Sequence, residues 1–302
     1  MKTLLEAIRP TIFIESQKLK SFLDIDLTIA TETFQHTGSF KFRAAYNLAV
    51  HAPNDEILTA SSGNFGQALA LACQILNKKC VVVMPETSAK VKIEAVRSYG
   101  AKVDLVDTKK VGRNKRVAQL AEQMPDAYVA SAYDDLFVIE GNATLGDELS
   151  ARDFDVVISP IGGGGLISGI SKGLCRNGNQ ATLIGAEPLL GNDAAKSLKA
   201  GKIIVNETEP MTIADGARTI SLGNHNWEII KSGVSEIIEV SDAKIIEAVR
   251  LYFGLANLKC EPTGALTFGA ILENKEKFAD KKICVIVSGG NVDAEVYRQI
   301  IR

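Results

Sequence analysis

The sequence predicts an α/β protein built on mainly parallel sheets. Short apolar runs rich in β-branched residues alternate with stretches of helical periodicity, which is the pattern of successive βα units. The apolar runs contain few charged residues, as expected of strands that are buried on both faces of a sheet. Turns that contain glycine follow several of these runs directly, and ligands of open α/β sheets bind beyond the carboxyl ends of the strands.

Five apolar runs are the clearest strands, and helices fit between them. The strands are expected at Lys79–Met84, Ala101–Val106, Asp155–Ser159, Thr182–Ala186 and Ile283–Val287. The helices are expected at Phe65–Leu76, Ala89–Tyr99, Leu166–Cys175, Asp242–Leu258 and from Gly264 to about Phe278. Gly100 is expected to end its helix, and Ser241 to be an N-cap, because these residue types favour those positions.

The composition excludes several classes of protein. The chain has 302 residues, which is enough for two lobes, and its net charge of -2 does not favour nucleic acid or anionic membrane as a partner. No apolar run approaches the roughly 20 residues that span a membrane, and the N-terminus lacks the pattern of a secretory signal. We therefore expect a cytoplasmic protein whose partner is a small molecule.

The residues that could carry chemistry are few. Five widely spaced cysteines without CxxC indicate neither a disulfide framework nor a zinc site. The three histidines lie far apart without metal-ligand spacing, and no GxSxG sequence is present. Chemistry at neutral pH must then come from lysine, hydroxyl groups and a cofactor.

The four consecutive glycines after the run DVVISPI are a candidate phosphate cradle. Glycine lets the backbone turn its N–H groups towards an anion, and the positive end of the following helix adds to the attraction. The segment is neither a Walker loop nor a strict GxGxxG. Two alternatives remain open, namely a tight turn for close helix–sheet packing and a dinucleotide fold in which Glu187 binds ribose.

Lys41 is a candidate nucleophile. It lies between Phe40 and Phe42, and apolar surroundings disfavour an ammonium ion and lower the pKa of the amine. A free amine at neutral pH is what imine formation requires. The alternative is a lysine that begins a helix and extends its charge to solvent.

Two further turns contain hydroxyl and amide groups. Ser61–Asn64 (SSGN) precedes a predicted helix and could hold a carboxylate through hydroxyl and N–H groups, or could be only a helix N-cap loop. Ser288–Asn291 (SGGN) follows the last predicted strand, and its hydroxyl could face a ligand or merely end the strand.

Together and in this order, these segments resemble the fold type II pyridoxal-phosphate enzymes, the tryptophan synthase β-like group. Within the group the chain is similar to the threonine/serine dehydratase and serine racemase family. The stretches that carry the resemblance are TGSFKFRAAYN, SSGNFGQALA, SPIGGGGLISGI, GAEP, TIADGARTISLG, EPTGA and VSGGN, and they cover nearly the whole chain. One departure is Phe65, where the family often has His.

The resemblance implies a role for each matching residue. Lys41 would form the Schiff base with pyridoxal phosphate, and Phe40 would pack against the ring. Asn64 would bond the ring hydroxyl oxygen, and Ser288 would face the pyridine nitrogen. The residues that would hold the phosphate are Gly162, Gly163, Gly164 and Gly165.

The resemblance also implies where the substrate binds and what happens to it. Ser61, Ser62 and Asn64 would receive the carboxylate of a small hydroxy amino acid such as L-threonine or L-serine. Lys41 would remove the α-proton, and loss of the β-hydroxyl would lead to a 2-oxo acid and ammonia. Alternatives on the same scaffold are an amino-acid racemase, with Ser62 as acid/base opposite the lysine, and a 3-hydroxyaspartate ammonia-lyase. For the latter, Lys110 and Arg113 could reach the second carboxylate, or could be solvated surface residues.

A cation site follows from the resemblance as well. Racemase-type members bind Mg²⁺ or Ca²⁺ at positions that match Glu187, Gly191 and Asp193, and oxygen ligands suit a hard cation. The alternative is two solvated acids on a loop.

The expected fold has two lobes, each a mainly parallel twisted sheet flanked by helices. Residues 1–53 and 134–302 would form the large cofactor-binding domain, and residues 54–133 the small inserted domain. The cofactor would lie between them, and the family resemblance implies a homodimer. A nucleotide-binding oxidoreductase or a non-catalytic binding protein is a rival of another class.

Overall fold

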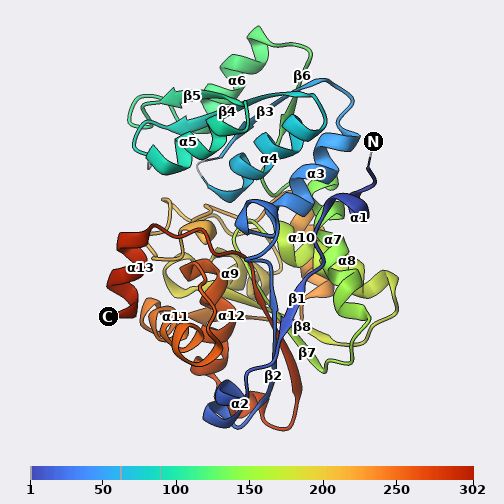
Figure 1. Ribbon diagram of the computed structural model, residues 1–302, viewed down its shortest axis with the longest axis vertical. Helices are drawn as coiled ribbons and strands as arrows, with labels where there is room; N and C mark the ends of the chain where they lie inside the picture. Colours follow the sequence, from blue (N-terminus) through green and yellow to red (C-terminus); the bar gives the residue numbers. More distant parts are fainter. Residues whose placement is uncertain (1, 62, 89) are drawn as a thin grey trace.

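The computed structural model describes residues 2–61, 63–88 and 90–302, and these form two sheets stacked along the long axis of the molecule (Figure 1). The larger sheet has the strand order β1-β2-β10-β7-β8-β9. Its strands are β1 Ile12–Ile14, β2 Asp26–Thr31, β7 Val156–Pro160, β8 Thr182–Pro188, β9 Glu236–Val240 and β10 Lys282–Val287. Neighbouring strands are parallel except for the antiparallel pair β1 and β2.

The smaller sheet is wholly parallel and comes from one continuous stretch of chain. Its strand order is β5-β4-β3-β6. The strands are β3 Glu56–Ala60, β4 Lys79–Pro85, β5 Lys102–Val106 and β6 Ala127–Ala130, and the connecting helices are α4 Asn64–Ile75, α5 Lys90–Ser98 and α6 Arg113–Gln123. The mainly parallel α/β architecture predicted from the sequence is therefore confirmed.

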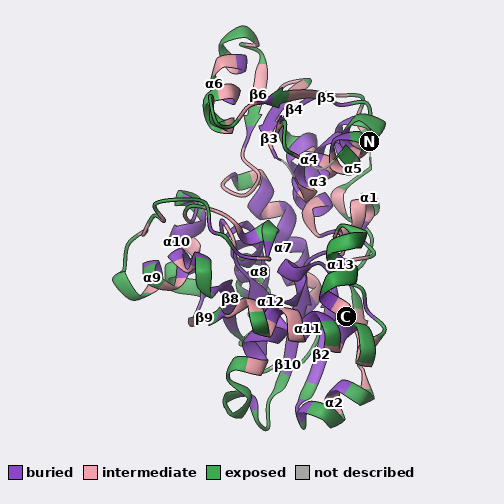
Figure 2. Ribbon diagram, turned by 90° about the vertical axis from the view of Figure 1, so that its left-hand side faces the viewer, coloured by how far each residue is buried: buried purple, intermediate pink, exposed green. Residues whose placement is uncertain are grey.

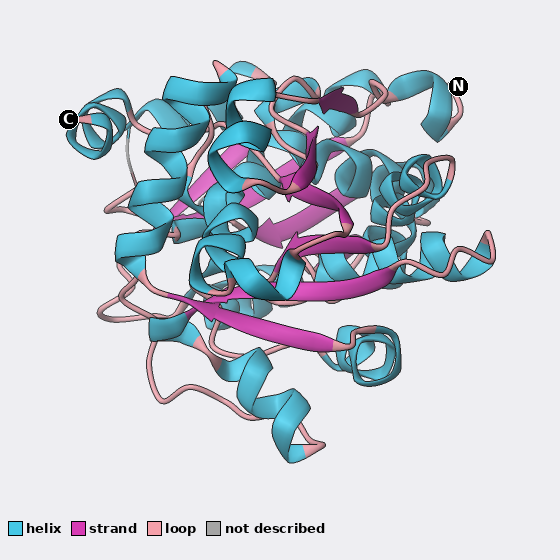
Figure 3. Ribbon diagram, turned by 90° about the horizontal axis from the view of Figure 1, so that it is seen from below, coloured by secondary structure: helices cyan, strands magenta, loops and turns pink. Residues whose placement is uncertain are grey.

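The remaining helices flank the sheets on both faces (Figure 3). The longer ones are α2 Gln17–Leu23, α3 Lys41–His51, α7 Leu136–Ser150, α8 Gly165–Arg176, α9 Asp193–Ala200, α10 Asn224–Gly233, α11 Asp242–Ala256, α12 Pro262–Glu273 and α13 Ala294–Ile301. The short ones are α1 Leu4–Ala7 and the 3₁₀ turns η1 His36–Gly38, η2 Leu189–Gly191, η3 Asp215–Ala217 and η4 Lys275–Phe278. No helix in the described ranges has the length and apolarity needed to cross a membrane.

The apolar runs are strands because both of their faces are buried. Along β10, Ile283 and Val285 face the core beneath α11 and α12, whereas Cys284 and Ile286 face the core beneath α8 and α10. Alternate residues of a strand point to opposite faces, so a strand covered on both sides has no position for a charge. Each such side chain contributes roughly 1.5–3 kcal/mol when fully buried. Figure 2 shows this buried centre running through the strands, α7 and α8.

Most predicted elements agree with the structure within one or two residues, and one prediction is wrong. The helix expected from Gly264 to about Phe278 begins at Pro262 and ends at Glu273, followed by η4. Gly100 does adopt the left-handed conformation, at φ 79°, and the Ser241 hydroxyl accepts a bond from the Lys244 N–H. Ala89, the expected first residue of another helix, lies outside the described residues.

The sequence did not predict α7, which packs between α3 and α8. Gly141 and Gly146 lower its helix propensity. A Cβ at Gly141 would lie 2.5 Å from the Arg43 carbonyl oxygen on α3, and a Cβ at Gly146 would lie 2.5 Å from the Ile170 carbonyl oxygen on α8. The two glycines are therefore required for close helix packing, which a propensity argument cannot detect.

Candidate active site

The loops that carry the predicted site residues leave the sheets at their topological switch points. In the large sheet, β8 and β9 lie on one side of β7, and β10 lies on its other side. In the small sheet, β4 and β5 lie on one side of β3 and β6 lies on the other. Ligands of open α/β sheets bind at such points, beyond the carboxyl ends of the strands. Gly162 and Ser288 follow β7 and β10, and Ser61 follows β3.

Lys41 is the first residue of α3, and its amine reaches the segment that follows β6. Nζ donates a hydrogen bond of 2.8 Å to the Ala132 carbonyl oxygen, which follows β6. Burial lowers the pKa of Lys41 from its ordinary value to about 8, although the nearby Glu261 acts in the opposite direction. At pH 7 about a tenth of such amines is unprotonated, which is far more than for a surface lysine.

The apolar surroundings of Lys41 differ in part from the prediction. Phe40 and Phe65 have their ring centroids 5.0 Å and 5.7 Å from Nζ. Phe42 instead turns away into the core that α3 shares with α4 and the smaller sheet, against His36 and Tyr46. Successive residues of a helix point in different directions, so only one of the two flanking phenylalanines contacts the amine. Phe65, the residue that replaces the family's usual His, contributes the second aromatic wall.

The four glycines form the turn between β7 and α8. Gly164 is the N-cap of α8 and has φ 95°, a conformation that favours glycine. A Cβ at Gly163 would lie 2.2 Å from Cδ2 of Tyr133, so the aromatic ring occupies the space that any other side chain would need. The first N–H groups of a helix have no acceptor within it. The turn thus has the geometry of an anion cradle.

Ser288 provides an observation that bears directly on cofactor binding. The residue is 1% exposed, and its hydroxyl has no hydrogen-bond partner among the described residues. Its backbone carbonyl accepts a bond from the Phe40 N–H, so it lies next to Lys41. A buried hydroxyl without a partner is costly unless a ligand completes it. Together with the glycine turn and the Lys41 amine, this hydroxyl fits pyridoxal phosphate.

Asn64 lies at the start of α4 and bonds two other parts of the chain. Its Nδ2 donates to both carboxyl oxygens of Glu261, and its Oδ1 accepts a bond of 2.8 Å from Asn291. Glu261 is 3% exposed, and burial raises its pKa to about 7. Neither Glu261 nor Asn291 was assigned a role from the sequence, although both belong to stretches that carry the family resemblance.

The structure places Ser61 just before α4, and its role in substrate binding stays a prediction. Its hydroxyl accepts hydrogen bonds from the N–H groups of Gly66, at 2.9 Å, and Gly63, at 3.4 Å. The bond from Gly66, in the first turn of α4, fits the helix N-cap loop that the sequence left open as the alternative, although the N-cap residue itself is Gly63. Ser62, the predicted acid/base of a racemase, lies outside the described residues.

The three predicted cation ligands surround the start of α9. Both oxygens of Glu187 accept 2.9 Å bonds from the N–H groups of Ala194 and Ala195. One oxygen of Asp193 accepts from Asn206, and the other is buried without a partner among the described residues. Burial raises the pKa of Asp193 to about 7 and that of Glu187 well above its usual value. Because both acids are 1% exposed, the alternative of solvated loop residues is wrong.

Among the residues that the structure describes, there is no group of three or more His, Cys, Asp or Glu side chains that could hold a metal ion. The predicted site has two carboxylates and a backbone carbonyl, so it differs in kind from such a cluster. The unpartnered oxygen of Asp193 is the observation that fits a cation.

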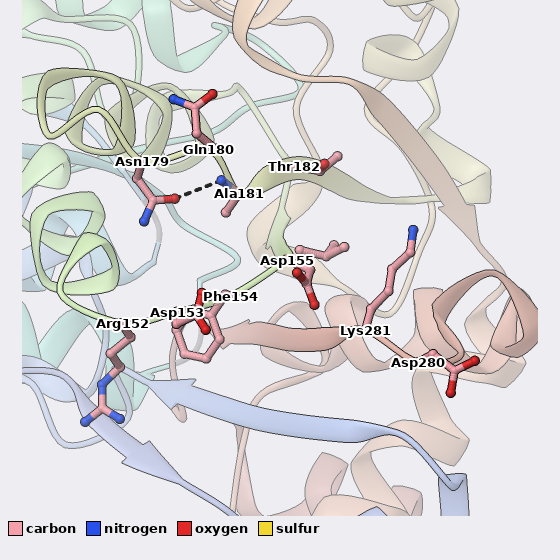
Figure 4. A pocket seen from close by; sticks show the side chains of 11 residues that line it. Arg152, Asp153, Phe154, Asp155, Asn179, Gln180, Ala181, Thr182, Asp280 and Lys281 are labelled. Atoms are coloured by element: carbon pink, nitrogen blue, oxygen red, sulfur yellow. Dashed lines mark hydrogen bonds between the residues drawn. The ribbon is translucent and has the colours of Figure 1, made fainter.

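An open pocket of about 540 Å³ lies at the opposite end of the large sheet (Figure 4). It is lined by residues at the amino ends of strands, among them Asp155, Thr182 and Lys281. None of the predicted site residues lies there. This surface hollow is therefore separate from the candidate site.

Together, the two-lobed α/β architecture, the lysine of lowered pKa, the glycine turn and the unpartnered serine hydroxyl define a fold type II pyridoxal-phosphate enzyme. The chain belongs to the family described as "Pyridoxal-phosphate dependent enzyme", whose model matches residues 4–289.

Known proteins of this family resemble the chain over almost its whole length. It is 36% identical to L-threo-3-hydroxyaspartate ammonia-lyase of Pseudomonas sp, over 95% of this chain and 91% of that protein. It is 37% identical to serine racemase of Schizosaccharomyces pombe, over 89% and 85%. Among solved structures, threonine deaminase of T.th. superposes with a TM-score of 0.88 at 36% identity, covering 94% and 92%. The chain is thus an enzyme of the ammonia-lyase and racemase group.

Proposed function

We propose that the enzyme catalyses β-elimination on a small hydroxy amino acid, such as L-serine or L-threonine, to a 2-oxo acid and ammonia. The observation that carries this proposal is the Lys41 amine, which lies between the rings of Phe40 and Phe65 and bonds the Ala132 carbonyl oxygen, while the Phe40 N–H bonds the Ser288 carbonyl oxygen. Pyridoxal phosphate supplies an aldehyde that binds amines and a ring that withdraws electrons from the α-carbon.

The residues of the chain divide the remaining work. Lys41 would hold the cofactor through its amine, and the same amine, when free, would take the α-proton of the substrate as general base. The glycine turn Gly162–Gly165 anchors the phosphate through N–H groups and the positive end of α8. Ser288 offers the ring nitrogen a neutral hydroxyl, which bonds it without adding charge. A ring with a neutral partner at its nitrogen would withdraw electrons less strongly. Elimination of a β-hydroxyl would tolerate this, because the leaving group carries away the negative charge that develops at the α-carbon.

A second candidate substrate is 3-hydroxyaspartate, and a specific contact favours it. Nζ of Lys92, on α5, lies 3.0 Å from Oδ2 of Asp215 in the large lobe. Asp215 precedes Gly216, whose carbonyl oxygen would lie 3.1 Å from a Cβ at Gly162. Lys92 therefore reaches the rim of the cradle, where a β-carboxylate could replace Asp215 as its partner. The name of the Pseudomonas relative supports the same substrate.

Arg113 joins the lobes in a similar way, with Nη2 lying 3.6 Å from Oε2 of Glu209. Lys110, the other residue considered for a second carboxylate, lies on the surface and pairs with Asp107. Lys110 is therefore a control and not a candidate ligand.

The test is an assay of the purified protein supplied with pyridoxal phosphate. L-serine, L-threonine and L-threo-3-hydroxyaspartate are added in turn, while cofactor absorbance and 2-oxo acid are recorded together. Oxo acid from any of them supports β-elimination. D-amino acid without oxo acid would mean racemisation, and a protein that binds no cofactor would overturn the proposal.

Lys92→Ala separates the two substrate classes. If Lys92 binds a β-carboxylate, its loss should raise KM for 3-hydroxyaspartate about tenfold or more, as expected for a hydrogen bond to a charged group, and leave KM for L-serine nearly unchanged. Lys110→Ala is the matched control and should change neither. Equal effects on both substrates would mean that Lys92 only holds the two lobes together and does not bind the β-carboxylate.

We also propose that Glu187, Gly191 and Asp193 bind Mg²⁺ or Ca²⁺. A cation that binds only the folded state stabilises it, so either ion should raise the temperature of thermal unfolding. Asp193→Asn should remove the response, whereas Asp153→Asn, at an exposed carboxylate that pairs with Lys282, should retain it. An identical shift in both variants would indicate nonspecific ion effects.

The resemblance to the family further supports two proposals of lesser weight, a homodimer and a cytoplasmic location. Light scattering of the purified protein tests the first, and cell fractionation tests the second.

A further inference from the structure

Glu261 is a buried carboxyl group for which the proposed chemistry has no use. It is the N-cap residue of α12, yet its side chain makes no capping bond. Instead, Oε1 and Oε2 lie 2.9 Å and 3.1 Å from Nδ2 of Asn64. A Cβ at Gly289 would lie 2.8 Å from Oε1, so the backbone leaves room for this carboxyl group.

The bond to Asn64 is the end of a chain of hydrogen bonds that joins four distant segments. Nδ2 of Asn291 donates to the Thr37 carbonyl oxygen at 2.6 Å and to Oδ1 of Asn64 at 2.8 Å. Thr37 belongs to the segment that carries Lys41, Asn291 to the SGGN turn, Asn64 to the SSGN turn and Glu261 to the EPTGA stretch.

The chemistry of these groups permits only one orientation of the Asn64 amide. A backbone carbonyl can only accept, so the Asn291 atom that faces Thr37 must be its nitrogen. That nitrogen also donates to Asn64, so the Asn64 atom facing it must be oxygen. The Asn64 atom that faces Glu261 is then its nitrogen, which donates to the Glu261 carboxyl oxygens. The Thr37 carbonyl therefore sets the orientation from one end, and the Glu261 oxygens accept from the amide at the other.

One N–H of Asn64 remains for a ligand. The amide nitrogen carries two hydrogens, and the two oxygens of a single carboxyl group lie close together and share one of them. The second is available to an acceptor between the lobes. A flipped amide would present an oxygen there and repel an anionic acceptor.

We propose that Glu261 is a positioning residue: together with Asn291, it holds the side-chain amide of Asn64 in one orientation. In this orientation the second N–H of Asn64 is free to bond the oxygen substituent of the cofactor ring. This inference rests on the proposed function, since it requires pyridoxal phosphate at this site. Glu261 acts through Asn64 and does not itself take part in proton transfer.

The test measures the dissociation constant of pyridoxal phosphate and the absorption spectrum of the bound cofactor in four variants. Asn291→Asp keeps the shape but removes the donor that faces Asn64. Glu261→Met removes the acceptor, whereas Glu261→Gln retains one acceptor oxygen. Thr267→Val is the matched control. Thr267 lies on α12, the helix that Glu261 precedes, and the substitution removes its buried side-chain bond of 3.1 Å to the Ile286 carbonyl oxygen.

We expect Asn291→Asp and Glu261→Met to weaken cofactor binding by about tenfold or more and to alter its spectrum, as for loss of a bond to a charged group. Glu261→Gln should stay within about threefold of the unmodified protein, because the orientation of the amide is retained. Thr267→Val should lower stability without changing affinity or spectrum.

Three results would overturn the inference. They are unchanged binding in Asn291→Asp and Glu261→Met, a loss in Glu261→Gln as large as in Glu261→Met, and a spectral change in Thr267→Val. If Glu261→Met does not fold, Asn291→Asp and Glu261→Gln decide. If the unmodified protein binds no cofactor, the proposed function fails instead.

Discussion

Replacing Lys41 with alanine is expected to abolish turnover and the absorption band of lysine-bound cofactor. The substitution removes both the amine that holds the cofactor and the general base, and a general base alone contributes about 10²–10⁴-fold to the rate. The expected loss in kcat is therefore at least about a thousandfold. Oxo-acid release and cofactor absorbance of the purified variant measure it.

The control for Lys41 is another lysine with a similar contact. Nζ of Lys259 donates a bond of 2.8 Å to the Gly290 carbonyl oxygen, close to the site but exposed. Lys259→Ala should keep turnover within about twofold, as usual for an exposed side chain outside the chemistry. Substantial activity in Lys41→Ala would contradict the assignment of the nucleophile.

The lowered pKa of Lys41 also predicts the pH dependence of cofactor attachment. With a pKa of about 8, the reactive unprotonated amine increases about tenfold per pH unit below pH 8 and little above it. The attachment rate in unloaded protein should rise in the same way and level off above about pH 8. A rate that continues to rise towards pH 10 would indicate a solvated lysine.

Replacing Arg43 with methionine is expected to cause the largest loss of stability. Arg43 is fully buried two residues after Lys41 and bonds both oxygens of Glu32, one oxygen of Glu148 and the hydroxyls of Thr11 and Thr144. Burial opposes its charge, but Glu32 and Glu148 outweigh this effect and raise its pKa above the usual value.

Removing one partner of a buried ion pair leaves the other charge uncompensated, which costs about 3–5 kcal/mol. Urea unfolding of Arg43→Met should therefore show a loss of about that size. The matched control is Arg116→Met, because Arg116 also pairs through two bonds of 2.8 Å with an acid, Asp104, but is 31% exposed. Partly exposed pairs contribute about 1 kcal/mol or less. Equal losses in the two variants would refute the role assigned to the buried network.

Local sequence is sufficient for the elements and for the type of chemistry. Strands buried on both faces, such as β10, must be apolar at every position, so they stand out as runs. The glycine turn before α8 and the lysine beside Phe40 indicated an anion cradle and a reactive amine. In each of these cases, the signal lies within a few neighbouring residues.

Contacts between distant segments could not be predicted in this way. The sequence predicted Phe40 and Phe42 beside Lys41, but in the structure the rings of Phe40 and Phe65 lie beside its amine. It gave no reason to place a helix at α7, whose two glycines are explained only by the helices packed against them.

The sequence by itself determined the mainly parallel α/β class, the turns proposed to bind ligands and the lysine suited to imine chemistry. Only the tertiary structure decided which groups face one another across the site. Asn64 and Glu261 are 197 residues apart, and Asn64 and Asn291 are 227 apart. The physical reason is that hydrogen bonding and burial depend on proximity in space, and the order of strands around the switch points, not the local residue pattern, sets that proximity.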